Sequence, residues 1–369
     1  MSVSNIISQK TKEEFEQIAK ELIDIKKDLR IGTTSLTPTN FADEMEKFLK
    51  SDTYNPVFTY TEKQLPDIEN VLEGFKKRAE KLSLPEDIKE HFLEYLDDQK
   101  MLFLTKKNIG KEKFSDYAHS LFDWGTDRLD VILAATPKNN FQLHYKHNMQ
   151  HSNKIKERFE KVLKSYGIDS FHVEINSFTS HMINAGYKKI SIGNEIKRYE
   201  CNVDRLIVHE IESHVIQTEN MKRTNSPLVE LYKYGNMNLY SEGLAVYNEI
   251  MTKKITPSAY EMYFNRIKAV RLLHKSFREI FETLVKDLPM YRAYIMTYRV
   301  KRGLRETKEA GGFPKDASYL LGFHEIETLV NEGFSKRQLY ITKSPVLTSL
   351  LLKYELVDDK NIITPRFLK

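Results

Sequence analysis

A short segment near the middle of the chain has the residue types and spacing of a catalytic metal site. Residues 206–215 read LIVHEIESHV, so Glu210 directly follows His209, and His214 lies five positions beyond that first histidine. Imidazole nitrogens are good zinc ligands, and a carboxylate beside the first ligand can act as general base toward the attacking water. The HExxxH pattern therefore predicts a zinc centre with His209 and His214 as ligands and Glu210 as the base.

The spacing of these histidines differs from the commoner HExxH motif, whose histidines at i and i+4 share one helix face. Five positions on an ideal α-helix separate two side chains by about 140°, too far to share one ion comfortably. One extra residue in the turn brings them together, and such π-bulges are frequent at functional sites. The spacing thus predicts a widened turn between His209 and His214, with Glu212 facing away from the ion.

A glutamate 28 residues after the second histidine completes the predicted ligand set. Catalytic zinc usually has three protein ligands and one open position, and Glu242 lies in the segment YSEGLAVY, which we expect to be helical. The alternatives are that Glu242 caps its helix, or that Glu249, two turns further on, competes for the metal. Gly243 and Ala245 are small, which we expect to let this helix approach the HExxxH helix closely.

The two motifs resemble a known family. HEIESH followed by SEGLA is similar to bacterial proteins that are named for a QEGLA motif and described as modulating flavohaemoglobin expression. These are similar in turn to the animal microtubule-associated tyrosine carboxypeptidases, zinc enzymes that remove a C-terminal tyrosine from α-tubulin. The resemblance extends from about residue 40 to the C-terminal region. It includes NPVF at 55–58, Arg302-Gly303, and GFPKDASYL at 312–320.

The resemblance implies a specific set of site residues. Zinc would be held by His209, His214 and Glu242, with Glu210 catalytic. Ser241 stands where the QEGLA motif has glutamine, at a position that is not a ligand. The resemblance also implies a peptide or protein C-terminus as the substrate.

A carboxypeptidase needs further groups that contact its substrate. A cation must bind the terminal carboxylate, and Arg302 and Lys315 are the candidates because they lie in segments that carry the resemblance. Tyr319 is a third candidate for substrate binding. An oxyanion donor is also required, and His181, Tyr240 and Tyr319 are the alternatives for it.

Two other segments have both functional and structural interpretations. Residues 187–192 form a candidate edge strand that could pair with an extended peptide, although a role as sheet scaffold is equally compatible with the pattern. His144, His147 and His151 could form a second metal site if the last two shared a helix face. No carboxylate lies among these histidines and lysines surround them, so we interpret the segment as a solvated surface.

The elements expected to position these residues are mainly helices. Apolar residues recur at helical spacing in the segments 12–29, 41–49, 72–82, 86–103, 202–220, 239–253, 258–285, 291–308 and 315–331. Segments 170–176 and 187–192 alternate as strands, with a turn at 184–186 between them. The pattern predicts a mainly helical α+β fold, gluzincin-like, with a small sheet ahead of the zinc-binding helix. We expect one compact unit over 1–369, with an N-terminal helical part at 1–110 and a catalytic part at 111–369.

Composition narrows the class of protein. The chain has 369 residues, and 57 Lys and Arg against 52 Asp and Glu leave a net charge of +5, too small and dispersed for a nucleic-acid-binding face. The single cysteine, Cys201, excludes an intramolecular disulfide and a cysteine-based zinc site. No run reaches the about 18 to 20 apolar residues of a membrane span, and the start lacks the apolar stretch of a signal peptide. We therefore expect a cytoplasmic protein.

These features together favour a zinc metallopeptidase, and within that class a carboxypeptidase that trims protein or peptide C-termini. An aminopeptidase or dipeptidase could use the same metal site. A regulatory binding protein that keeps zinc for structural reasons is the alternative from another class. Glu210 favours an enzyme, because a structural zinc site needs no general base.

Overall fold

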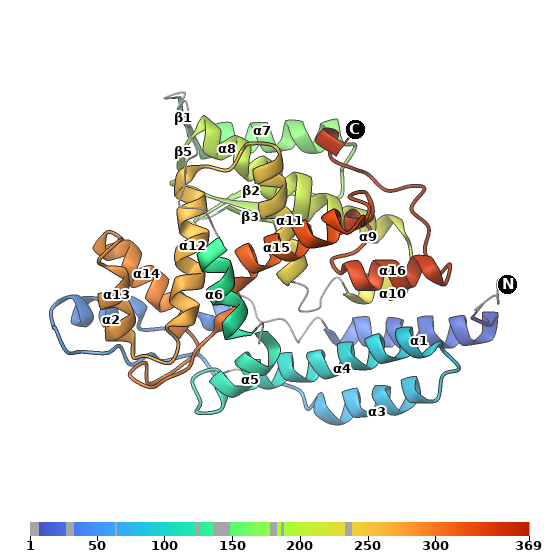
Figure 1. Ribbon diagram of the computed structural model, residues 1–369, viewed down its shortest axis with the longest axis horizontal. Coiled ribbons are helices and arrows are strands. Elements are labelled where there is room, and N and C mark those ends of the chain that lie inside the picture. Colours follow the sequence, from blue (N-terminus) through green and yellow to red (C-terminus); the bar gives the residue numbers. More distant parts are fainter. Residues whose placement is uncertain are drawn as a thin grey trace. The chain divides into compact units, whose positions relative to one another are not determined.

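The computed structural model describes residues 7–26, 33–62, 65–122, 125–135, 148–177, 183–185, 188–232 and 238–368. Across these residues the fold is mainly helical with small sheets, as predicted (Figure 1). No helix within the described ranges has both the length and the apolar character needed to cross a membrane.

The chain forms two compact units, and neither is one continuous segment. Unit 1 contains Met1–Thr136, Tyr234–Asn236 and Met262–Ala317, and unit 2 contains Pro137–Lys233, Met237–Glu261 and Ser318–Lys369. The HExxxH and SEGLA motifs both belong to unit 2. Our expectation of a single compact unit, divided near residue 110, stays a prediction.

Unit 1 is helical in its described part. Its elements are α1 (Gln9–Lys26), η1 (Thr33–Leu36), α2 (Phe41–Leu49), α3 (Glu69–Glu80), α4 (Glu86–Lys107), α5 (Phe114–Phe122), α6 (Thr126–Ala135), most of α12 (Pro257–Arg271), α13 (Phe277–Leu284), α14 (Met290–Lys301) and η4 (Pro314–Ala317). Phe48 anchors an aromatic cluster, with its ring centroid 5.0 Å from that of Phe277 and 4.9 Å from that of Phe281. Both pairs meet edge to face, the arrangement that aromatic quadrupoles favour.

Two segments that carry the family resemblance shape unit 1. In the NPVF segment, Asn55 Oδ1 accepts a 2.8 Å hydrogen bond from the backbone N–H of Arg278. Gly303 has a φ of +92°, and a Cβ at this position would lie 2.0 Å from the Phe114 ring. These residues therefore hold distant parts of the chain together, and glycine is needed where α14 ends.

Unit 2 contains the described strands together with the helices around them. Its elements are β1 (Met149–His151), α7 (Ser152–Ser165), β2 (His172–Asn176), β3 (Ile183–Ala185), β4 (Lys189–Gly193), β5 (Lys197–Tyr199), α8 (Glu200–Leu206), the π-helix η3 (Ile207–Val215), α9 (Ile216–Arg223), α10 (Pro227–Tyr232), α11 (Asn238–Met251), the start of α12, α15 (Ser318–Asn331), η5 (Gln338–Tyr340), α16 (Pro345–Lys353) and η6 (Arg366–Leu368).

The three-stranded sheet of unit 2 has the order β2-β4-β3, with β2 parallel and β3 antiparallel to β4. Its apolar side chains join those of α7 and η3 in one core. That core includes Phe159 of α7, Val173 of β2, Ile190 of β4 and Ile211 of η3. The apolar residues of the HExxxH segment are interspersed among its polar residues. They pack into this core and so hold η3 between the sheet and α7.

The sheet corrects two of our sequence predictions. Residues 189–193 form the central strand β4, so the segment 187–192 is not an edge strand; in the described sheet the edge strands are β2 and β3. The predicted turn at 184–186 is also wrong at its start, because Asn184 and Ala185 belong to β3. A three-residue strand is too short to show an alternating pattern, and strand order depends on pairing between distant segments.

Several predicted helices differ in extent. The predicted helix 258–285 is two helices, α12 and α13, because Ser276 forms a capping box with Glu279 and starts a new helix. The predicted helix 291–308 ends at Lys301, just before Gly303. His151 is exposed, in line with our interpretation of a solvated surface, and it ends β1 and so does not share a helix face with His147; His144 and His147 lie outside the described residues.

Candidate metal centre

The HExxxH segment forms a π-helix over Ile207–Val215, which confirms the predicted widened turn. At its end the N–H of Ile216 donates to the carbonyl of Ile211, five residues earlier. The extra residue per turn brings His209 and His214 to one side of the helix, with ring centroids 5.0 Å apart and planes at 82°. This corrects the separation that an ideal α-helix would impose.

Glu242 meets both histidines. Its Oε2 lies 3.5 Å from Nε2 of His209 and 3.5 Å from Nε2 of His214. Donor atoms of the three side chains all lie within 4.8 Å of one another. Tetrahedral zinc with bonds near 2.0 to 2.1 Å places its ligand atoms about 3.3 Å apart, and the two 3.5 Å separations from Glu242 are close to that value.

The electrostatics of the triangle favour a positive charge. Glu242 Oε2 is buried and makes no hydrogen bond to any described residue, which is costly for a carboxylate without a cation. Burial alone would raise the pKa of Glu242, but the two histidines hold it well below its usual value. Burial would likewise lower the pKa of His209, yet the carboxylates of Glu242 and Glu249 raise it to about 10. The donor set therefore fits a divalent cation.

Glu249 fixes the orientation of His209 and is not one of the three converging donors. Its Oε1 lies 2.7 Å from His209 Nδ1 and also accepts a 2.7 Å hydrogen bond from Arg205 Nη1. Glu249 is fully buried. It lies two turns after Glu242 on the same face of α11, so the spacing in the sequence places it near the centre, but as a partner of His209 and not as the rival ligand. A carboxylate at Nδ1 leaves Nε2 directed at Glu242 and free to bind a metal.

Ser241 plays the corresponding part for His214. Its Oγ lies 3.1 Å from His214 Nδ1 and donates a 3.1 Å hydrogen bond to Gln217 Oε1. Gln217 is anchored in turn by a 2.9 Å bond from its Nε2 to the carbonyl of Leu339. The serine that replaces glutamine in the motif thus orients a histidine, a role that its sequence position alone did not reveal.

Glu210 lies beside the triangle without entering it. Its Oε2 accepts a 2.9 Å hydrogen bond from the backbone N–H of Ala185 in β3, and the side chain is buried. The edge strand therefore fixes this carboxylate through one oxygen. Glu212 faces elsewhere, as predicted, since Tyr166 donates its hydroxyl proton to Glu212 Oε1 at 2.5 Å.

A close helix pair supports the centre. Helix α11 runs beside α15 (Figure 1), and a Cβ on Gly243 would lie 2.1 Å from the backbone of Gly322. Helix α11 also packs against the HExxxH helix, as expected, but the close approach that Gly243 permits is to α15. The same contact places Tyr319, one turn before Gly322, with its ring centroid 6.5 Å from that of His209 and the ring planes 20° apart.

The other predicted substrate residues have different surroundings. Arg302 belongs to unit 1, is 6% exposed, and has its Nη2 3.6 Å from Oδ1 of the buried Asp316. Lys315 is half-buried in η4, also in unit 1. Tyr240 is half-buried at the start of α11, and His181 lies outside the described residues. Their roles in substrate or oxyanion binding stay predictions.

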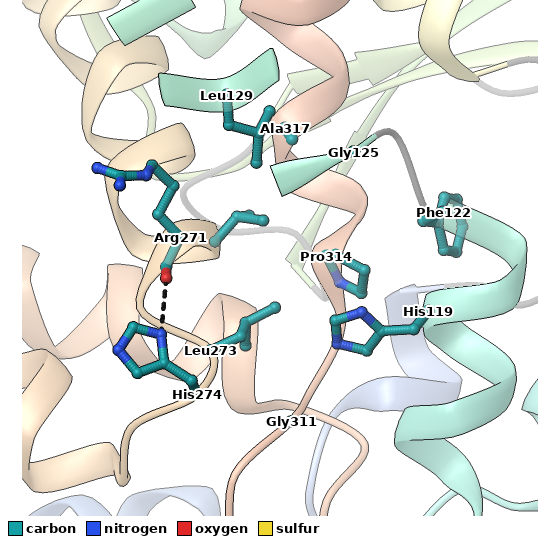
Figure 2. A pocket seen from close by; sticks show the side chains of 11 residues that line it. His119, Phe122, Gly125, Leu129, Arg271, Leu273, His274, Gly311, Pro314 and Ala317 are labelled. Atoms are coloured by element: carbon teal, nitrogen blue, oxygen red, sulfur yellow. Dashed lines mark hydrogen bonds between the residues drawn. The ribbon is translucent and has the colours of Figure 1, made fainter. Parts of the chain in front are cut away.

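Two cavities lie apart from the three donors. One cavity, of about 440 Å³, lies in unit 2. Val208 and Glu212 of η3 contribute to its wall, and neither is a candidate metal ligand. The other, of about 340 Å³, lies in unit 1, and His119 and His274 contribute to its wall (Figure 2). His274 Nδ1 lies 3.1 Å from the carbonyl oxygen of Arg271. No carboxylate occurs among the described residues lining this second cavity, so it lacks the mixed donor set found around Glu242.

Comparison with known proteins agrees with the resemblance seen in the motifs. No curated protein matches the chain. A family model described as microtubule-associated tyrosine carboxypeptidase matches residues 46–368, which is most of the sequence and includes every residue of the candidate centre. The chain therefore belongs to the microtubule-associated tyrosine carboxypeptidase family.

Proposed function

We propose that this chain is a zinc-dependent, gluzincin-like carboxypeptidase that removes the last residue, tyrosine by the family's name, from a protein or peptide. Membership of the family implies a carboxypeptidase with a protein or peptide substrate. The observation that carries the zinc assignment is the convergence of His209, His214 and Glu242 on one small volume, with a buried carboxylate oxygen that makes no hydrogen bond to the described residues. The two histidines and Glu242 would hold the ion.

The mechanism assigns Glu210 as general base and acid. Zinc, when bound, would polarise the scissile carbonyl and lower the pKa of the attacking water. Glu210 takes a proton from that water and later returns it to the leaving amine. Ala185 holds one oxygen of Glu210 in place. Tyr319, whose ring is nearly parallel to that of His209 with the centroids 6.5 Å apart, is the proposed donor to the developing oxyanion.

The edge strand β3 is the proposed platform for the substrate backbone. In the described sheet β3 pairs only with β4, so its other edge can form hydrogen bonds with an extended peptide. The N–H of Ala185 in the same strand holds Glu210. A peptide along β3 would therefore pass beside the general base.

Metal content tests the assignment directly. We expect native mass spectrometry to detect one zinc per chain in the wild-type protein. His209→Ala and His214→Ala each remove one of three ligands, so both variants should lose the metal. His172→Ala is the matched control, because His172 is an exposed histidine of the same unit, and it should retain zinc. Full zinc occupancy in both ligand variants would show that the site is assigned wrongly.

A peptide library tests the reaction. Removal of single residues from C-termini supports the proposal, whereas cleavage from N-termini would indicate an aminopeptidase on the same centre. Zinc-loaded protein that cleaves no peptide and no folded protein with a C-terminal tyrosine would favour the regulatory binding protein instead.

Glu249 should control metal affinity although it is not a ligand. Glu249→Gln keeps the size of the side chain but removes the charge that faces His209 Nδ1. Loss of such a partner typically weakens metal binding by about 10- to 100-fold. Competition with a zinc chelator measures the change, and Glu332→Gln, at an exposed position of unit 2, serves as control. Equal zinc affinity in both variants would contradict the role given to Glu249.

A further inference from the structure

Behind the π-helix lies a chain of three buried polar side chains: Ser213, Asn248 and Tyr340. Ser213 Oγ donates a 2.9 Å hydrogen bond to the carbonyl of Val208. Asn248 Nδ2 donates to Ser213 Oγ at 2.8 Å and to the Tyr340 hydroxyl at 2.8 Å. All three side chains are at most 1% exposed. The mechanism uses none of them.

The first of these bonds spans the same interval as the metal-ligand candidates. Val208 and Ser213 are five residues apart, and so are His209 and His214, one position further along the π-helix. If the turn relaxed to α-helical spacing, the two histidines would move to about 140° apart. A side-chain bond across five residues favours the wide turn, and because a π-turn is rarely stable by itself, it needs such support.

The second bond ties that turn to the helix that carries the third donor. Asn248 lies on α11 between Glu242 and Glu249, and its amide reaches Ser213 on the π-helix. The hydroxyl of Tyr340, from η5, accepts a second hydrogen bond from the same Nδ2 group. Breaking this chain therefore affects both the spacing of the histidines and the approach of Glu242.

We propose that Ser213 and Asn248 are positioning residues that set the geometry of the metal centre by holding the π-turn open. The proposal rests on the proposed function, since it assumes that His209, His214 and Glu242 bind zinc. Neither side chain is expected to touch the ion or the substrate.

The test is zinc affinity, measured on the full chain by competition with a chelator of known affinity. Ser213→Ala and Asn248→Ala should each weaken zinc binding by about 10- to 100-fold, as loss of supporting groups typically does. Ser213→Thr keeps the hydroxyl and should recover most of the affinity. Tyr340→Phe removes only the hydroxyl at the end of this hydrogen-bonded series. It should weaken zinc binding about fivefold, the equivalent of one ordinary hydrogen bond. This mild variant also keeps the test valid if Ser213→Ala does not fold.

A control and a second readout separate positioning from general stability. Thr348→Val removes another fully buried hydroxyl of unit 2, one that lies 2.8 Å from Thr342 Oγ1. It should lower the thermal unfolding temperature of the metal-free protein without changing zinc affinity. With cobalt in place of zinc, the visible spectrum should shift in Ser213→Ala and stay unchanged in Thr348→Val.

Two outcomes are decisive. If wild type binds zinc, and Ser213→Ala and Asn248→Ala bind it within twofold as tightly with unchanged cobalt spectra, the positioning role is wrong while the metal assignment stands. If wild type itself binds no zinc, the proposed function fails, and this inference fails with it.

Discussion

Replacing Glu210 with glutamine is expected to leave zinc bound while kcat for peptide cleavage falls. General acid–base catalysis typically contributes a factor of about 10² to 10⁴, and we expect a loss near the upper end of that range. Glutamine keeps the size of the side chain and can still accept the hydrogen bond from Ala185. It cannot take the proton of the attacking water or return it to the leaving amine. Since one group serves both steps, the loss should approach the maximum for general acid–base catalysis.

The measurement is kcat and zinc content for wild type, Glu210→Gln and Glu212→Gln side by side. Glu212 lies in the same π-helix but bonds to Tyr166, so its replacement should leave kcat within a few-fold of wild type. Unchanged cleavage by Glu210→Gln would exclude Glu210 as the base. Loss of zinc from this variant would show that Glu210 helps to hold the ion.

The second large effect is expected at the contact between α11 and α15. A Cβ on Gly322 would lie 2.0 Å from the carbonyl oxygen of Leu239 and 2.9 Å from Cα of Gly243. Gly322→Ala therefore forces two backbones apart. Overpacking typically lowers the free energy of unfolding by about 1 to 3 kcal/mol, and we expect this variant to lose at least the upper value. Because α11 carries Glu242 and α15 carries Tyr319, zinc affinity should fall together with stability.

Gly74→Ala is the matched control for this substitution. Gly74 lies within α3, and a Cβ there would meet no atom within 4 Å. Alanine is the better helix former by roughly 0.5 to 1 kcal/mol, so this variant should be slightly more stable than wild type. Denaturant unfolding compares the two variants. Equal stability would mean that α11 and α15 can separate without cost.

The sequence predicted the wide turn between the two histidines better than it predicted the surroundings of the candidate centre. The wide turn followed from the i,i+5 spacing of the histidines alone, because helix geometry allows few ways to bring such residues together. Ser276 and Glu279 also match the S-x-x-E pattern of a capping box, a local signal in the sequence that divides the predicted long helix 258–285.

Other features depend on contacts between distant segments and had no local signal. Strand β3 is three residues long and is defined only by its pairing with β4. That Gly243 meets Gly322 could not be inferred from spacing, because the two glycines are far apart in the sequence. The bond between Ser241 and His214 likewise appears only when α11 packs against the π-helix. Such pairings are decided by tertiary packing, which overrides local propensity.

The discontinuous course of unit 2 has a consequence for when the enzyme can become active during its synthesis. A nascent chain that has reached Ala317 already contains both histidines and Glu242. It still lacks α15, with Gly322 and Tyr319, and also Tyr340 of η5. Since domains fold as units when their segments are complete, we expect the three candidate donors to converge only after the segment that follows residue 317 has left the ribosome. On that expectation, the order of segments along the sequence would delay peptidase activity until α15 and η5 have been made.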